Sequence, residues 1–237
     1  MAEHAVGAAA REPIDLGPAL RDGYLQRFLC APACDPVELR VHRMRCVLPY
    51  DAPPSWRVLA VRCSGVAALA CAASEFDPDE QRFVPSERHW PARLESDRML
   101  PPVVTSCTLD AGLEATELER LEREGLWLAG SPAALVTACA QGARLLELRA
   151  SGAFEPEVPA RLAVFIAARD CALLTAGGPI TAQQALLHAA AWRLAWRNYR
   201  QLRHERPDLP PDPQFEWARE QDVLPDMTGD EQRLLGG

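Results

Sequence analysis

Hydrophobic and polar residues alternate in the first half of the chain with the two-residue period of β-strands. Residues 37–50 follow this period but change parity midway, which predicts a strand with a β-bulge near His42. The apolar segments 56–63 and 66–73 flank a Ser-Gly pair and predict a β-hairpin. A further strand is predicted over 103–109. The first half is therefore expected to be rich in strands.

Helical spacing is more frequent in the second half. Leucines recur at helical spacing before Gly125, a residue type that commonly ends a helix. Ser131 followed by a proline, and Pro159, are typical helix starts, and Thr181 with Gln184 matches a capping box. With a short amphipathic helix near the start of the chain, the predicted helices cover 18–30, 115–125, 131–150, 159–176 and 181–204.

These elements predict an α+β fold. A small antiparallel sheet, formed by about 37–109, is expected to pack against a helical second half, about 113–205, followed by an acidic, extended C-terminal tail. The predicted organisation is a disordered segment at 1–14, a single α+β domain over 15–206, and a tail over 207–237 that is rich in acidic, proline and aromatic residues.

The charged residues exclude several functional classes. The 237-residue chain has a formal net charge of -8, and its 25 basic residues are all arginines. Without a lysine ε-amine, the chain lacks the group required by Schiff-base and pyridoxal-phosphate enzymes, lysine-dependent phosphate-binding loops and protein kinases. The acidic balance also disfavours nucleic acid as a partner.

The N-terminal composition and the hydropathy predict a cytoplasmic protein. Residues 1–16 contain acidic side chains and lack the apolar core of a secretory signal. The longest apolar run, 162–168, is far shorter than the roughly 20 residues that span a bilayer, so no membrane partner is expected. The eight cysteines are accordingly predicted to be reduced and mostly buried.

Two groups of cysteine and histidine residues suggest an enzymatic alternative. The first group is Cys30, Cys34, His42 and Cys46, which offers the thiolates and imidazole that zinc prefers, at a spacing typical of no zinc motif. The second is Cys107 as a nucleophile, with His89 as its base. The alternative is thus a cysteine-dependent or zinc-binding enzyme centred on Cys107 or on Cys30–Cys46. Buried core thiols are the simpler interpretation, and we assign no catalytic residue, metal ligand or cofactor.

The last predicted helix has an aromatic stripe beside a cationic stripe. Five arginines and one glutamate lie within 193–206, whereas 207–237 contains eight acidic residues and two arginines. Adjacent segments of opposite charge allow two interpretations. In one, the tail folds back and completes the protein's own core. In the other, the tail or the arginine stripe binds another protein.

We therefore interpret the chain as a non-catalytic protein-interaction or accessory subunit. Its expected partner is another protein or a second copy of itself, bound through the last helix and the tail. The predicted partner-binding residues are Trp192, Arg193, Trp196, Arg197, Tyr199, Arg200, Phe215 and Trp217.

Overall fold

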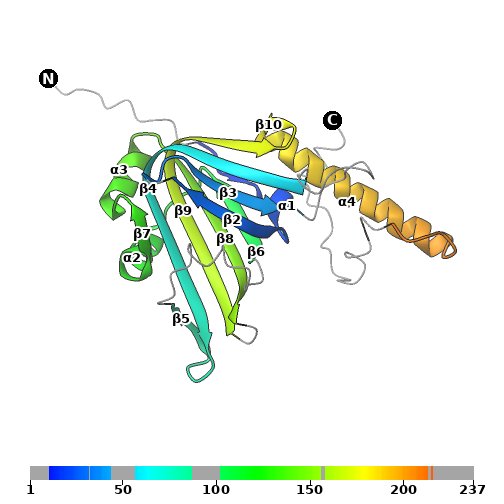
Figure 1. The fold of residues 1–237 in the computed structure, drawn as a ribbon, viewed down its shortest axis with the longest axis horizontal. Coiled ribbons are helices and arrows are strands. Elements are labelled where there is room, and N and C mark those ends of the chain that lie inside the picture. The colour runs from blue at the N-terminus through cyan, green and yellow to red at the C-terminus, as the bar shows by residue number, and fades with distance from the viewer. Residues whose placement is uncertain are drawn as a thin grey trace.

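Long antiparallel strands dominate the computed structural model of the chain (Figure 1). The structure describes residues 11–31, 33–43, 57–86, 102–155, 158–212 and 215. In chain order the elements are β1 (Ile14–Asp15), α1 (Gly17–Leu20), β2 (Tyr24–Cys30), β3 (Val37–His42), β4 (Val58–Asp77), β5 (Arg82–Pro85), β6 (Val103–Leu109), α2 (Ala115–Glu124), β7 (Leu126–Ala129), α3 (Pro132–Ala140), β8 (Arg144–Glu155), β9 (Val158–Thr175), β10 (Gly178–Ile180) and α4 (Ala182–Glu205).

The ten strands within the described residues form one antiparallel sheet that closes on itself. Its order is β10-β9-β8-β6-β2-β3-β4-β5, with β1 beside β6 and β7 beside β4. Strand β9 also pairs with β4, in a register that runs from Ala60 opposite Leu174 to Glu75 opposite Ala160. This additional pairing joins β4 to β9, so that β9, β8, β6, β2, β3 and β4 make a ring of six strands.

Two hydrophobic cores lie on the two sides of this ring. Along β9, Leu162, Val164 and Ile166 belong to the inner core, to which all six strands of the ring contribute. The intervening Ala163 and Phe165 belong to the outer core, which is formed with α2 and α3. Successive side chains of a strand point to opposite faces, so the middle of β9 is buried on both.

The long strand β9 corrects the helix predicted over 159–176. A strand that is buried on both faces shows a continuous apolar run instead of alternation, and such a run does not distinguish a strand from a buried helix. The helix predicted over 131–150 is likewise correct only in its first part, because α3 ends at Ala140 and β8 follows. The α+β class is confirmed, but the sheet is large and extends through the predicted helical half.

A glycine inside β4 corrects the predicted hairpin around Ser64. Residues 58–77 are one continuous strand, in which Gly65 has a φ of 65°. The register with β9 shifts directly after it, between Val66 and Ala68. The glycine is therefore part of an irregularity within the strand and does not reverse the chain.

A bulge also explains why 18–30 resembles an amphipathic helix. Only Gly17–Leu20 is helical, and Tyr24–Cys30 is strand β2. The register of β2 against β3 shifts between Leu25 and Arg27, so Leu25 and Phe28 are both buried although they are three residues apart. Three-residue spacing is typical of a helix, and here a bulge produces it in a strand.

Other predicted elements are confirmed at or near their expected bounds. They are the strand over 103–109, the helix ending before Gly125, the N-cap at Ser131 and the capping box of the last helix. Strand β3 ends at His42, and most of the predicted 37–50 strand beyond it lies outside the described residues. The segment 1–10 and residues 216–237 also lie outside them, so the predicted disordered start and acidic tail remain predictions.

The helices occupy two sides of the ring (Figure 1). Helices α2 and α3 cover the outer face of β4 and β9, while α1 and the first turns of α4 lie together on the other side. From there α4 extends away from the strands. None of the helices among the described residues combines the length and the apolar character needed to cross a membrane.

Candidate functional site

Helix α4 begins at a complete capping box. The backbone N–H of Gln184 donates to the Thr181 hydroxyl at 3.1 Å, and the backbone N–H of Thr181 donates to the Gln184 side chain at 2.7 Å. Two N–H groups that the helix start leaves unpaired are satisfied in this way. The first turns then bury Ala185 and Ala189 in the inner core, which fixes α4 to the sheet.

The middle of α4 presents its aromatic face to the chain that follows it. The rings of Trp192 and Trp196 are stacked with centroids 6.2 Å apart, and Tyr199 continues the row at 5.8 Å. Phe215 lies against all three, with centroid distances of 5.0 to 5.9 Å. Trp192 is fully buried, and Phe215 is 7% exposed. These four rings form a hydrophobic cluster within one chain.

Polar contacts fold the segment after α4 back along the helix. The Arg203 guanidinium donates to the carbonyl oxygens of Pro207, at 3.1 Å, and of Leu209. The backbone N–H of Asp212 donates to the Tyr199 hydroxyl at 3.2 Å. A single contact of this kind adds only modest stability, but together these contacts direct the chain toward the aromatic face that Phe215 covers.

The predicted partner-binding residues thus fall into three groups. Trp192, Trp196 and Phe215 are buried against one another, and Tyr199 lies beside them. Arg193 is also buried, at 7% exposure, while Arg197 and Arg200 are exposed. Trp217 lies outside the described residues. Partner binding by these residues remains a prediction.

The opposite face of α4 exposes leucines whose exposure the sequence pattern did not predict. Leu187, Leu194 and Leu202 are 39%, 40% and 47% exposed. They recur at intervals of seven and eight residues, close to two helical turns, and so follow one side of the helix. Arg197 and Arg200 are exposed as well: Arg197 follows Leu194 by about one turn, whereas Arg200 lies about 120° around the helix from Leu194, toward the aromatic side. We call these five residues the leucine-arginine face.

Cys30 and Cys34 contact each other through their thiols, but His42 lies far from Cys30. In the register of β2 with β3, Cys30 is opposite Val37 whereas His42 is opposite Tyr24, so they lie at opposite ends of the strand pair. Five residues of strand separate the two positions by about 16 Å, far beyond a shared coordination sphere. Cys46 is outside the described residues, and the described residues contain no group of three side chains suited to hold a metal ion.

Cys107 is a core residue of β6. Its side chain is fully buried, and burial raises the pKa of its thiol. A raised pKa lowers the fraction of thiolate, the form that attacks a substrate. The proposed base, His89, lies outside the described residues. The enzymatic alternative therefore gains no geometric support at this residue.

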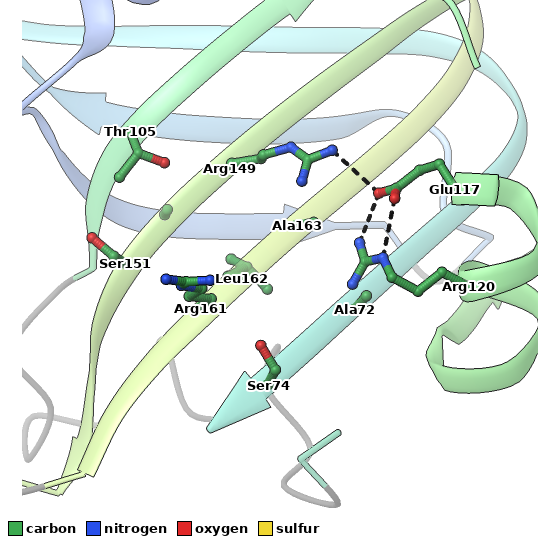
Figure 2. A pocket seen from close by; sticks show the side chains of 11 residues that line it. Ala72, Ser74, Thr105, Glu117, Arg120, Arg149, Ser151, Arg161, Leu162 and Ala163 are labelled. Carbon is green, nitrogen blue, oxygen red and sulfur yellow. Dashed lines mark hydrogen bonds and ion pairs between the residues drawn. The ribbon is translucent and has the colours of Figure 1, made fainter. Parts of the chain in front are cut away.

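A polar pocket lies on the outer face of the sheet, beside α2 (Figure 2). It has a volume of about 520 Å³. Its lining residues come from four strands and one helix and are Ala72, Ser74, Thr105, Glu117, Arg120, Arg149, Ala150, Ser151, Arg161, Leu162 and Ala163. Small side chains form much of its floor, and arginines form its walls. We call this depression the arginine pocket.

One carboxylate links α2 to the sheet at the edge of this pocket. Glu117 accepts hydrogen bonds from Arg120, at 2.7 and 3.1 Å, and from Arg149 of β8 at 3.2 Å. The hydrogen bonds from Arg120, with the positive charge of Arg149, lower the pKa of Glu117. The carboxylate is therefore ionised near neutral pH and holds both guanidinium groups in position.

No signal in the sequence drew attention to the arginine pocket. Arg149 and Arg161 belong to segments predicted to be helices, so their shared position on one sheet face was not predictable.

No protein-family model, curated protein or solved structure matches the chain.

Proposed function

We propose that the protein is a non-catalytic accessory subunit that binds an acidic segment of another protein on the leucine-arginine face of α4. A single observation supports this most. The aromatic side of α4 is covered within the chain by Phe215, whereas the remaining surface of the helix exposes three leucines and two arginines. A helix with one covered and one open apolar side resembles half of a helix-to-helix contact.

The charge of α4 favours an acidic partner. Within Ala182–Glu205 there are four arginines and one glutamate, a net of three positive charges with histidine neutral. Burial and the nearby charge of Arg43 lower the pKa of His188, which keeps that imidazole neutral near pH 7. Among the described residues, Arg197 and Arg200 have no ion-pair partner. They remain available to a carboxylate from outside.

A second copy of the chain is less suitable than a different protein. Two copies of α4 packed through this face bring Arg197 and Arg200 of both helices close together, and like charges across an interface oppose association. An acidic helix or extended segment has no such cost. Its apolar side chains can cover the leucines while its carboxylates pair with the arginines.

In this proposal the predicted partner-binding tryptophans have a structural role within the chain. Trp192 and Trp196 are expected to hold α4 and the returning chain together, and not to meet the partner. A cytoplasmic location, and the expectation that neither nucleic acid nor a membrane is the partner, rest on composition alone and are part of the same proposal.

Charge reversal on α4 tests this function. The full-length protein is immobilised and exposed to an extract of the cells that make it. We expect one acidic protein to be retained, and expect Arg197→Glu with Arg200→Glu to reduce its retention by about tenfold or more, because two attractive pairs become repulsive. The matched control reverses Arg27 and Arg169, which are exposed arginines on β2 and β9.

The variant with Arg27 and Arg169 reversed distinguishes a specific contact at α4 from an effect of the overall charge of the protein. Equal loss in both double variants, or equal retention in both, would show that α4 is not the docking surface. Retention of nothing but the chain itself, with a dimer in size-exclusion chromatography, would replace the acidic partner with a second copy.

A further inference from the structure

We infer that the arginine pocket binds a phosphorylated small molecule. This site is separate from the proposed docking surface, since the pocket lies beside α2 and the leucine-arginine face lies on α4 (Figure 1). Neither inference depends on the other.

The shape of the pocket suits a small ligand. Its volume of about 520 Å³ falls within the range of about 300 to 1,000 Å³ that is typical of ligand pockets. Helices α2 and α3 cover the outer sheet face around Phe165, and the pocket begins where this cover ends. There, Ala72 and Ala163 are opposite each other in the register of β4 with β9. Their methyl groups leave space that larger side chains would fill.

The charge of the pocket suits an anion. Three guanidinium groups and one carboxylate line it, a net of two positive charges. Arg120 and Arg149 share Glu117, and Arg149 also donates to Glu147 at the margin. Much of their charge is therefore balanced within the chain. The third arginine, Arg161, has no carboxylate partner among the described residues.

Arg161 is held in a position from which it can receive a ligand. Its guanidinium carbon lies 3.8 Å from the centroid of the Phe83 ring, so one face of the guanidinium is stacked. Stacking restrains a flexible side chain and leaves the N–H groups at its edge free to donate. Ser74 and Ser151 are its direct neighbours on β4 and β8, and both line the pocket (Figure 2).

This row of donors favours phosphate over a single carboxylate. A guanidinium donates in parallel to two oxygens of an oxyanion, and serine hydroxyls on both sides can donate to others. A phosphate group offers three terminal oxygens and up to two negative charges, which matches the net charge of the lining. The alanine floor accommodates the remainder of the ligand.

Calorimetric titration with pyrophosphate tests the inference, with inorganic phosphate and citrate as comparison ligands. We expect saturable binding of pyrophosphate at low ionic strength, weaker binding of inorganic phosphate, and weakening of both as salt is added. Arg161→Gln is expected to weaken pyrophosphate binding by about tenfold, because it removes the unbalanced charge. Arg169→Gln, an exposed arginine of the same strand outside the pocket, is the matched control and should leave binding unchanged.

A second variant keeps the test decisive if Arg161→Gln disturbs the fold. Glu117→Gln removes the negative charge that balances two guanidinium groups but keeps an amide oxygen that accepts their hydrogen bonds, so the arginines stay in position and pyrophosphate binding is expected to tighten by about threefold. Absence of saturable pyrophosphate binding at millimolar concentration would overturn the inference. So would equal effects of Arg161→Gln and Arg169→Gln, weaker binding by Glu117→Gln, or tighter binding of citrate than of pyrophosphate.

Discussion

Replacing Phe165 with alanine is expected to lower the free energy of unfolding by about 3 to 5 kcal/mol. Phe165 is 1% exposed and lies in the outer core between β9 and the two covering helices. Truncation removes apolar contacts and leaves a cavity between layers that cannot fully close. Chemical unfolding followed by circular dichroism measures the change. The control is Val136→Ala on α3, a 46% exposed residue whose truncation should change stability by no more than about 0.5 kcal/mol.

A substitution at Ile166, the residue after Phe165, tests the inner core of the closed ring in the same way. Ile166 is fully buried in the inner core, on the other side of the strand from Phe165. Ile166→Ala should therefore also cost about 2 to 5 kcal/mol. Large effects at two consecutive residues are expected of a strand covered on both faces. A small effect at either one would contradict the two-core arrangement.

Replacing Phe215 with alanine is expected to shift tryptophan emission to longer wavelength and to lower stability by about 3 kcal/mol. Phe215 covers Trp192 and Trp196, and without its ring water reaches two indoles that are now buried. Fluorescence in the folded state reports the exposure, and chemical unfolding reports the stability. Leu194→Ala, on the exposed side of the same helix, is the control and should change neither.

The two readouts distinguish a local contact from a general loss of structure. A red shift with unchanged far-ultraviolet circular dichroism indicates that only the cover over α4 has opened. Unchanged emission and unchanged stability would mean that Phe215 does not lie on the aromatic face in solution, and the separation of α4 into a covered side and an open side would then be wrong.

Local signals in the sequence predicted the starts of α3 and α4 and the end of α2. The Ser131 hydroxyl accepts the backbone N–H of Ala134 at 3.2 Å, and the Thr181–Gln184 capping box is present as expected. Both depend on residues within one turn of each other, so neighbouring side chains determine them. Gly125 likewise follows the last residue of α2.

Strand β9 was predicted to be a helix and β4 to be a hairpin, because tertiary packing, and not local sequence, determines the hydrophobic pattern of these long strands. Strand β9 is apolar on both faces since one side meets the inner core and the other meets α2 and α3. Gly65 lies beside a register shift within β4 where a turn was expected, and a Cβ at this position would be 2.9 Å from the Cβ of Arg169 in β9, about one hundred residues later. Neither environment is visible within a short window of sequence.

Of the two candidate sites, the one on helix α4 could be predicted in part from the sequence and the arginine pocket could not. The aromatic and arginine stripes of α4 were predictable because a helix arranges nearby residues by a fixed period. The arginine pocket was not, since Ser74, Ser151 and Arg161 become neighbours only through the pairing of β4, β8 and β9. The exposure of Leu187, Leu194 and Leu202 was not predicted either, because the sequence alone did not show which apolar stripe of α4 would be covered.

Site-specific photo-crosslinking from α4 tests the central claim most directly. A photoreactive amino acid replaces Leu194 on the leucine-arginine face, and in a parallel protein it replaces Val136, which is similarly exposed on α3. We expect irradiation in the native cells to link position 194 to one acidic protein, and expect reversal of Arg197 and Arg200 to abolish this product. Position 136 should yield no such product. An equal product from both positions, or none from position 194, would contradict the account.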